Sequence, residues 1–433
     1  MKISELKNHF DEEIEINGFV DNVRNLQWVQ FVIIRDLSGL VQVTIEKSDE
    51  ANKELVEIVN NLSIESTVKI KGVVKESPKV KLNGMEIIPN TIEVTSISDT
   101  LPINIKDKDA QEIDTRLDYR FLDLRNDYNK NIFLIQSDVV KYLREYLYKN
   151  DFTEIHTPKL IGTASESGSE VFEVKYFDRK AYLAQSPQFY KQMAMSSGFE
   201  KIFEVGPVFR AENSNTNRHT TEFTGFDVEF SYIDSYVDVM NLEQDLIIYM
   251  LKNIKEKYGN LIKEKYNQEI LIPESFPRIK LSDLYDELEK RYGYKVDERE
   301  KNDLTREAEK LSYKYSMEEY NSEFLFVTDF PSEKRAFYHL RKDGIPQGYD
   351  LIYRGVEITT GAQREHRYEI LKSQAEEKGL KNDVEFYLEF FKYGCPPHGG
   401  FGIGVDRITM LLLGIPTIKE SMFIFRGPNR LNP

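Results

Sequence analysis

The residues with the clearest chemistry form a charged block near the middle of the chain. Gly206-Pro207-Val208-Phe209-Arg210-Ala211-Glu212 is followed at short range by Arg218-His219 and Glu222-Phe223. The fork of a guanidinium can span two oxygens of an α-phosphate, and a second Arg-His pair can reach the far end of a bent nucleotide. This block predicts a triphosphate site without a glycine-rich phosphate loop. We therefore expect the chain to activate a substrate with ATP.

A second group of residues suits a substrate carboxylate. Lys191 lies in Gln185-Ser186-Pro187-Gln188-Phe189-Tyr190-Lys191-Gln192, and Arg364 ends Gly361-Ala362-Gln363-Arg364. A point charge and a bidentate guanidinium together match a carboxylate, whereas an amide would turn its NH₂ toward two donors and leave buried groups unpaired. Taken alone, the two cations are equally well explained as surface salt-bridge partners.

A third group consists of hard oxygen ligands. Asp350, Glu357 and Thr360 offer two carboxylates and a hydroxyl, which suit Mg²⁺ because this ion keeps several waters and bridges phosphates. Cys395 is the only cysteine, and the six histidines are scattered, so we expect neither an internal disulfide nor a zinc site.

Composition limits the class of protein. A chain of 433 residues with 40% hydrophobic and 12% aromatic residues can bury large cores in two or three domains. No apolar stretch is long enough to cross a bilayer, so we expect a cytoplasmic protein without a membrane partner. The net charge of −15 argues against a protein that coats nucleic acid by bulk attraction. A lysine ribbon at positions 69–81 could follow a phosphate backbone or be a solvated strand face.

Three regions emerge along the chain. Residues 1–100 read as about five short strands with one helix near Ala51–Asn60, a pattern that predicts a small barrel of the oligonucleotide-binding (OB) type, although an SH3-like barrel has the same periodicity. Residues 101–129 read as a hinge or connector. Residues 130–433 mix strands and helices and are expected to form the catalytic domain, with a connecting subdomain at about 255–335.

The third region begins with a strong amphipathic helix over residues 130–149. Its apolar residues recur at three- and four-residue spacing, and an extended segment ending at Pro158 follows. This pair of elements could form a subunit interface or an ordinary packing unit. Further helices are expected at Val237–Tyr258, Leu281–Arg291 and Val384–Tyr393.

Three segments together carry a resemblance to a known family. The helix with the strand ending at Pro158, the block from Phe209 to His219, and Gly400-Phe401-Gly402-Ile403-Gly404-Val405-Asp406-Arg407 occur in the order of the three signature motifs of class II aminoacyl-tRNA synthetases. With an N-terminal OB-type barrel, the whole chain resembles the aspartyl, asparaginyl and lysyl subgroup in its archaeal/eukaryotic architecture. The resemblance implies an α+β protein with a catalytic antiparallel sheet flanked by helices.

The resemblance also implies an activity and a set of site residues. Asparaginyl relatives carry an acidic residue at the position of Lys191, so the match favours an aspartate–tRNA ligase that forms aspartyl-adenylate from L-aspartate and ATP with Mg²⁺, then charges the 3′ end of tRNA. The implied catalytic residues are Arg210, Glu357 and Arg407. The implied ATP-binding residues are Arg210, Glu212, Arg218, His219, Phe223, Glu357 and Arg407. Those for aspartate are Glu166, Gln188, Lys191, Arg210, Asp227 and Arg364, and those for the metal are Asp350, Glu357 and Thr360.

The N-terminal barrel is expected to read the anticodon. Phe31 is the candidate for stacking an unpaired base and Gln42 for a base edge, with Arg24 and Lys81 as further contacts. Selective relatives carry tryptophan near the position of Asp21, so its replacement here favours charging of tRNA-Asn as well as tRNA-Asp. The helix at 130–149 implies a homodimer.

Two departures from the family pattern stand in the motifs. Asp406 replaces a usual glutamate, and Phe425-Arg426-Gly427 replaces a usual Pro-Arg-Asp. A catalytically silent paralogue that binds aspartate, nucleotide or tRNA as a regulator is therefore the alternative hypothesis. Retention of Arg210, Lys191, Glu357 and Arg407 favours the enzyme.

Overall fold

The computed structural model describes residues 1–162, 170–214, 216–380 and 383–433. Contacts divide the chain into two compact units, Met1–Asn104 and Ile105–Pro433. The segment interpreted as a connector, residues 101–129, is therefore divided, and most of it packs as part of the second unit.

The first unit is a closed five-stranded barrel with strand order β1-β2-β3-β5-β4, which confirms the predicted OB-type fold. Alternate residues fill its interior, as in β2, where Gln30, Val32 and Ile34 are buried while their neighbours are half-exposed. The elements of this unit are η1 (Ile3–Asn8), β1 (Glu13–Asn25), β2 (Val29–Arg35), β3 (Leu40–Glu46), η2 (Glu50–Asn52), α1 (Lys53–Asn60), β4 (Thr67–Glu76) and β5 (Met85–Ser96).

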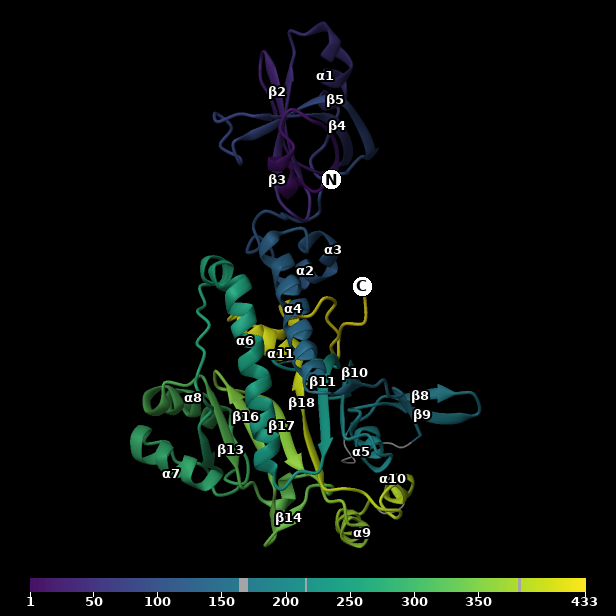
Figure 1. The fold of residues 1–433 in the computed structure, drawn as a ribbon, viewed down its shortest axis with the longest axis vertical. Helices are drawn as coiled ribbons and strands as arrows, with labels where there is room; N and C mark the ends of the chain where they lie inside the picture. The colour runs from purple at the N-terminus through teal and green to yellow at the C-terminus, as the bar shows by residue number, and fades with distance from the viewer. Residues whose placement is uncertain (163–169, 215, 381–382) are drawn as a thin grey trace. The chain divides into compact units, whose positions relative to one another are not determined.

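The second unit is built on an eight-stranded sheet with the order β12-β13-β16-β17-β18-β11-β10-β6 (Figure 1). Its strands run antiparallel except for two short edge strands, which pair in parallel. This confirms the predicted antiparallel catalytic sheet. The strands are β6 (Thr153–Glu154), β10 (Lys201–Phe209), β11 (Glu222–Ser231), β12 (Arg278–Lys280), β13 (Phe324–Thr328), β16 (Gly348–Tyr353), β17 (Val356–Gln363) and β18 (His398–Gly404).

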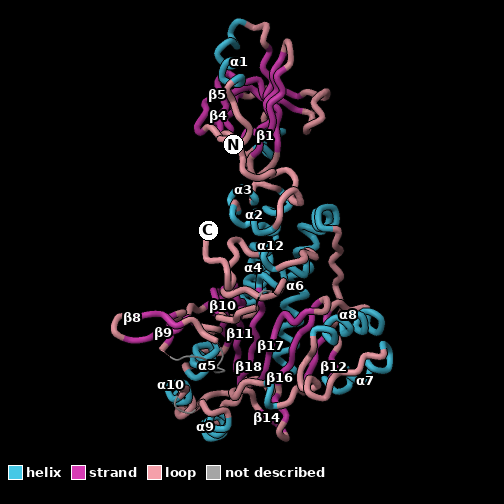
Figure 2. The backbone as a smooth tube through the Cα atoms, turned by 180° about the vertical axis from the view of Figure 1, so that it is seen from behind, coloured by secondary structure: helices cyan, strands magenta, loops and turns pink. Residues whose placement is uncertain are grey.

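Three helices cover one face of this sheet, namely α4 (Asp127–Lys149), α6 (Tyr236–Tyr266) and α11 (Val405–Leu412) (Figure 1). Figure 2 shows the molecule from behind, with α4 and α6 on the far side of the sheet. The helix α4 begins three residues before the predicted start, because the Asn126 side chain caps it by accepting from the Tyr128 amide. Its stripe from Ile132 to Leu147 is fully buried against α6 and the sheet. The same stripe therefore fixes the helix on the sheet.

The region predicted to form a connecting subdomain, at about residues 255–335, contributes strands to the main sheet. The helix α6 runs on to Tyr266, and the strands β12 and β13 extend the sheet at one edge. A smaller apolar cluster lies beneath α7 (Leu281–Tyr292) and α8 (Arg306–Tyr320). Residues 278–328 are thus tied to the catalytic sheet by backbone hydrogen bonds.

The remaining elements are short and lie around the sheet. The helix predicted at Val384–Tyr393 is confined to α10 (Glu385–Glu389), because turns follow it. The others are α2 (Ile113–Asp118), α3 (Arg120–Asp123), β7 (Leu160–Ile161), β8 (Glu173–Tyr176), β9 (Arg179–Leu183), α5 (Gln188–Ser196), η3 (Ser332–Lys334), β14 (Arg341–Lys342), β15 (Ile345–Pro346), α9 (Tyr368–Glu377) and α12 (Ile418–Ser421).

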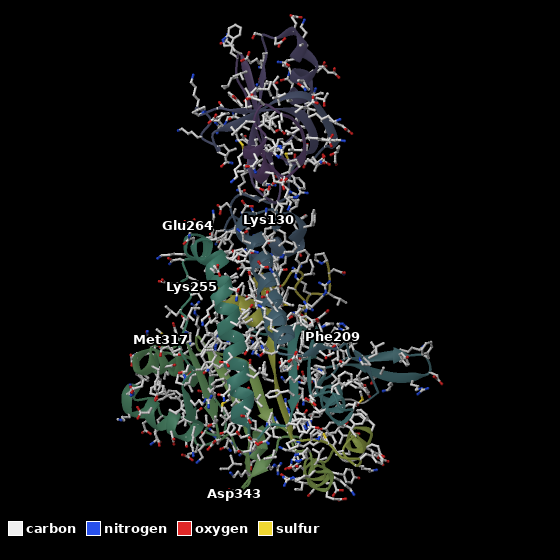
Figure 3. All side chains as sticks on the ribbon, viewed as in Figure 1. Lys130, Phe209, Lys255, Glu264, Met317 and Asp343 are labelled. Atoms are coloured by element: carbon white, nitrogen blue, oxygen red, sulfur yellow. The ribbon has the colours of Figure 1, made fainter. Side chains whose placement is uncertain are left out.

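Buried arginines join the start of the second unit to its end, where Arg116 lies 3.4 Å from the Glu420 carboxylate. The Arg116 Nε donates to Asp123 at 2.8 Å, and Arg120 NH2 donates to the carbonyls of Glu420 and Met422 at 3.0 and 2.9 Å. Figure 3 shows the side chains on this frame, with Lys130 near the start of α4 and Lys255 and Glu264 along α6. In the described part of the chain, no helix is long and apolar enough to span a membrane.

Candidate active site

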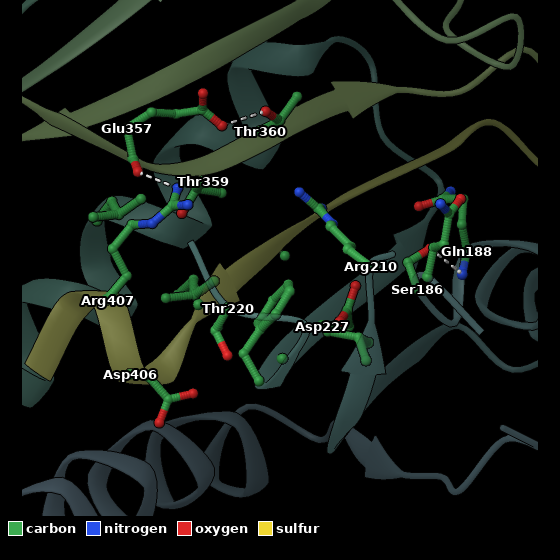
Figure 4. Close-up of a pocket in the computed structure, with 18 of the residues that line it drawn as sticks. Ser186, Gln188, Arg210, Thr220, Asp227, Glu357, Thr359, Thr360, Asp406 and Arg407 are labelled. Carbon is green, nitrogen blue, oxygen red and sulfur yellow. Dashed lines mark hydrogen bonds between the residues drawn. The ribbon is translucent and has the colours of Figure 1, made fainter. Parts of the chain in front are cut away.

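A polar pocket opens on the sheet face opposite α4, α6 and α11. Its walls come from β10, β11, β17, β18, α5 and the first turn of α11, and it has a volume of about 220 Å³ with an opening to solvent (Figure 4). The pocket gathers predicted residues that lie up to 219 positions apart in the chain. Those that line it are Gln188, Lys191, Arg210, Glu212, Arg218, His219, Phe223, Asp227, Glu357, Thr360, Arg364 and Arg407.

Strand alternation on β11 explains how one segment serves both core and pocket. Phe226 and Val228 are fully buried in the core beneath the helices, whereas Phe223 and Asp227 line the pocket. Successive side chains of a strand point to opposite faces, so Glu229 must lie on the same face as Asp227. The sequence prediction named Asp227 and missed Glu229, although this period of two could have identified it.

The two predicted carboxylate-binding cations meet at Glu229. Arg364 Nε donates to Glu229 Oε1 at 3.0 Å, and Lys191 Nζ lies 3.4 Å from Glu229 Oε2 and 3.0 Å from Asp227 Oδ1. Burial acts to raise the pKa of Glu229, but Arg364 and then Lys191 outweigh it and lower the pKa below its usual value. Glu229 is therefore ionised and holds both cations in place.

Glycines in β18 make this buried carboxylate possible. A Cβ at Gly400 would lie 2.0 Å from the Val228 carbonyl oxygen and 2.3 Å from Glu229 Oε2, distances that no real side chain adopts. Gly400 pairs directly with Glu229 in the sheet, and Gly402 with Asp227. The glycine-rich third motif thus leaves room on one strand for the acidic residues of the next.

The opposite end of the pocket carries the residues expected to hold ATP. The Arg210 guanidinium lies 5.3 Å from the centroid of the Phe223 ring, and Arg407 NH1 donates to the Glu357 carbonyl oxygen at 2.8 Å (Figure 4). Arg218 pairs with Glu309 of α8, and burial lowers the pKa of His219. Burial therefore favours the neutral form of this imidazole.

The predicted metal ligands lie on two paired strands. Asp350 of β16 is directly opposite Thr360 of β17, and the Thr360 hydroxyl lies 2.9 Å from Asp350 Oδ1 and 3.1 Å from Glu357 Oε1. Burial, and next the charge of Asp350, raise the pKa of Glu357 to about 7. The three side chains predicted to bind Mg²⁺, an ion that takes oxygen ligands, therefore lie next to one another. No cluster of three or more His, Cys, Asp or Glu residues suited to a metal occurs within the described ranges.

Two of the predicted residues, Asp350 and Gln188, form hydrogen bonds with side chains that the sequence prediction did not include. Both oxygens of Asp350 accept hydrogen bonds from Arg335, which the sequence prediction did not include. The Gln188 amide donates to Gln192, which in turn reaches His398 at 2.9 Å. Glu166 lies outside the residues that the structure describes.

Asp406 has a clear role despite its departure from the family pattern. Its carboxylate accepts from the Thr224 amide at 2.9 Å and from the Gln136 side chain at 3.2 Å, so it ties α11 to β11 and α4. Burial raises its pKa to about 6. Although its side chain is one methylene shorter than that of the usual glutamate, Asp406 therefore still connects the three elements α11, β11 and α4.

On the barrel unit, three of the predicted anticodon residues, Arg24, Phe31 and Gln42, lie on the outer face of the strands. Arg24 of β1 is paired with Phe31 of β2, and Gln42 of β3 donates to Thr44 at 3.1 Å on the same face. Lys81 is exposed in the turn between β4 and β5. The lysine ribbon is partly neutralised, since Lys69 and Lys71 pair with Glu15 and Lys75 with Asp11.

Comparison with known proteins agrees with both units. The model of tRNA synthetases class II (D, K and N) matches residues 112–425, and that of the OB-fold nucleic acid binding domain matches residues 14–95. The chain belongs to the class II tRNA synthetases of the D, K and N group.

Relatives of this synthetase cover its whole length. It is 43% identical to the aspartate–tRNA(Asp) ligase of Pyrococcus abyssi over 99% of this chain and 100% of the relative, and 42% identical to the aspartate–tRNA(Asp/Asn) ligase of Methanopyrus kandleri over 98% and 96%. The aspartyl-tRNA synthetase structure from Entamoeba histolytica has a TM-score of 0.88 at 35% identity, covering 100% of this chain and 92% of that one. The asparaginyl-tRNA synthetase of Pyrococcus horikoshii, solved with asparaginyl-adenylate, has a TM-score of 0.90 at 30% identity, covering 100% and 99%.

Proposed function

We propose that this synthetase is an aspartate–tRNA ligase that activates L-aspartate with ATP and transfers it to the 3′ end of tRNA. The observation that carries the proposal is the buried pair Lys191 and Arg364 in a pocket that Arg210 and Arg407 also line. Paired cations receive the side-chain carboxylate of aspartate, whereas an asparagine amide would turn its donors toward them. The names of the aspartate–tRNA ligase relatives support this assignment.

The first chemical step needs no nucleophile from the protein. An oxygen of the aspartate α-carboxylate attacks the α-phosphorus of ATP, and the bond to the pyrophosphate oxygen breaks. Arg210 neutralises the charge that develops on the phosphoryl oxygens, and Arg407 holds the nucleotide from the side of α11. Phe223 supplies the flat apolar surface for the adenine ring. Most of the acceleration then comes from positioning.

The second step transfers the aspartyl group to tRNA. The terminal 3′-hydroxyl attacks the carbonyl carbon of the adenylate, and AMP leaves. Asp227 is positioned to receive the substrate amino group, because it is an acceptor at the border between the cation pair and the nucleotide end of the pocket. We assign the same role to Glu166.

The metal site follows from the donor set. Asp350, Glu357 and Thr360 would hold Mg²⁺, which would supply charge neutralisation at the phosphates of ATP. The hydroxyl of Thr360 keeps the two carboxylates of adjacent strands together. The metal would therefore be shared between the protein and its nucleotide.

The partners follow from the reaction. The barrel face with Arg24, Phe31 and Gln42, together with Lys81, would bind the anticodon loop by stacking and polar contacts.

A homodimer is supported by exposed aromatic side chains on the second unit, with Phe121 65% and Phe423 60% exposed. Since ATP, aspartate and tRNA are pooled in the cytoplasm, we place the enzyme there.

The proposal is tested by ATP–pyrophosphate exchange with single amino acids. Exchange that requires both L-aspartate and Mg²⁺ is expected, because Lys191, Arg364, Arg210 and Arg407 all line one pocket. Robust exchange with asparagine or lysine and none with aspartate would overturn the substrate. Absence of exchange with any amino acid, in a protein that still binds ATP, would favour the silent paralogue.

A further inference from the structure

Arg335 stands directly behind the candidate metal site. It follows η3 in the connection between β13 and β14, and its two terminal nitrogens donate to the two oxygens of Asp350 at 2.9 and 2.7 Å. This bidentate pairing is the strongest geometry available to a guanidinium and a carboxylate. The carboxylate expected to bind a divalent cation is therefore already occupied by a side-chain cation.

Apart from this pairing, Arg335 has few attachments. Its guanidinium carbon lies 3.8 Å from the centroid of the Phe330 ring, and its side chain is 9% exposed. Its buried Nε has no hydrogen-bond partner among residues 1–162, 170–214, 216–380 and 383–433. The segment just before it is at the surface, where Glu333 and Lys334 are exposed. Asp350 and the ring of Phe330 therefore hold the guanidinium.

The charges around the site balance without a metal. Two carboxylates, Asp350 and Glu357, lie beside two guanidinium groups: Arg335 donates to both oxygens of Asp350, and Arg407 donates to the Glu357 carbonyl oxygen. A divalent ion added to this group would raise the net charge by two, and the excess would repel Arg335 at short range. ATP phosphates bring the negative charge that offsets this excess.

We propose that Arg335 is the resident counter-ion of Asp350, which it holds while the site lacks a divalent cation and releases in part when the cation arrives with ATP. The inference rests on the proposed metal site. Arg335 acts through Asp350 and is a positioning residue. It keeps the nucleotide-free enzyme from binding metal strongly and so couples occupancy of the metal site to ATP.

The test measures binding of Mn²⁺ to the full-length protein without ATP, by the electron paramagnetic resonance signal of free Mn²⁺. Arg335→Gln is expected to tighten Mn²⁺ binding by about tenfold or more, because it removes the competing charge. Arg341→Gln is the matched control, since it removes the same charge from the same stretch of chain but from a pair with Glu377. Mn²⁺ affinity that is unchanged or weaker in Arg335→Gln, or equally tightened in Arg341→Gln, would overturn the proposal.

Two further variants keep the test decisive. The double variant Arg335→Gln, Asp350→Asn lacks both charges and is expected to lose the gain in Mn²⁺ affinity; a gain that persists there would place the metal elsewhere and overturn the proposal. Should Arg335→Gln not fold, Arg335→Lys keeps the charge but not the fork. Because only the bidentate pairing with Asp350 is lost, a gain in Mn²⁺ affinity of a fewfold, smaller than that expected of Arg335→Gln, is expected, and no gain would count against Arg335.

The outcome is separable from the proposed function. Aspartate-dependent exchange by the wild-type enzyme tests the activity, whatever the Mn²⁺ result. If exchange is normal and Arg335→Gln binds Mn²⁺ no more tightly, the counter-ion role alone is wrong.

Discussion

At the scale of single residues, the site depends on one buried carboxylate that touches no substrate. Glu229 holds Arg364 and Lys191 together, and its fully buried charge is compensated only by these two cations and the nearby polar groups of the described chain. Removing one member of such a cluster leaves an uncompensated buried charge, which costs several kcal/mol. Specificity for a carboxylate is thus a property of the cluster.

Arg210 allows the most direct test at this scale. Arg210→Ala is expected to reduce aspartate-dependent ATP–pyrophosphate exchange by about 10²-fold or more, the scale of losing one group that stabilises charge in the transition state. Thermal unfolding of the variant should be close to that of the wild type, because the guanidinium contacts the Phe223 ring at the pocket surface. Near-normal exchange would show that Arg210 is only structural.

At the scale of elements, the sheet creates the site through the contrast between β11 and β18. One strand carries acidic side chains toward the pocket at alternate positions, and its neighbour carries glycines opposite them. Neither strand alone forms a site. The helix α11 begins where β18 ends, which brings Arg407 to the nucleotide end of the same pocket.

Adding a methyl group at Gly400 of β18 should therefore lower the stability of the folded protein. Gly400→Ala is expected to lower the free energy of unfolding by about 1–3 kcal/mol through overpacking, and to raise the KM for aspartate by displacing Glu229. Gly206→Ala on β10 is the control, because a Cβ there meets only the Lys159 and Glu204 side chains at ordinary contact distances of 3.4 Å and more. Thermal unfolding and exchange kinetics of the two variants check this difference; an equal effect of both would contradict it.

The packing of α6 on the sheet introduces a pH dependence. Glu243 is fully buried, accepts from the Tyr349 hydroxyl at 2.6 Å, and has its pKa raised by burial from 4.5 to about 7. Between pH 4.5 and 7 the Glu243 carboxyl therefore stays protonated in the folded state but loses its proton in the unfolded state. The free energy of unfolding falls as pH rises through that window. Above pH 7 the destabilisation is complete, at about 3 kcal/mol.

Glu243→Gln removes the titration and keeps the shape. Relative to the wild type, this variant is expected to gain about 3 kcal/mol in free energy of unfolding between pH 4.5 and pH 7.5. Urea unfolding at several pH values measures the difference. A constant offset between the two proteins across this range would show that Glu243 does not titrate there.

At the scale of the whole molecule, the second unit presents aromatic side chains that its own core does not use. Phe121 and Phe423 lie at the joined start and end of this unit, and Phe423 meets Phe133 of α4 edge-on at 5.3 Å. We expect a C2-symmetric homodimer that buries well over ~1,200 Å² through this region. Light scattering that shows a stable monomer at micromolar concentration would contradict this.

The choice of tRNA is a second property of the whole molecule, because it joins anticodon contacts on the barrel to chemistry in the catalytic unit. Asp21, where selective relatives carry tryptophan, is held in an ion pair with Arg35 at 2.8 Å. Without that aromatic contact, we expect the free-energy preference for tRNA-Asp over tRNA-Asn to fall by ~1–3 kcal/mol, which is enough for the enzyme to charge tRNA-Asn as well. Parallel charging of tRNA-Asp and tRNA-Asn transcripts measures it. A thousandfold preference for tRNA-Asp would show that the enzyme is strict.

The sequence determined the fold class and the family, because local patterns and motifs report local physics. Short apolar runs separated by turn signals predicted the barrel strands, the three- and four-residue spacing predicted α4, and the order of three motifs predicted the class II catalytic sheet. Most candidate site residues were named for the same reason, since Arg210, Lys191 and Arg364 each stand in a recognisable segment.

Tertiary structure alone decided which of these side chains meet and what holds them. Glu229 and Arg335 escaped the sequence analysis because their importance comes from partners 15 to 135 positions away, not from their own neighbours. The assignment of β12 and β13 to the main sheet was likewise hidden, because strand pairing is a long-range contact with no local pattern. Sequence periodicity sets the direction of each side chain, and only the packing of strands and helices decides what that side chain meets.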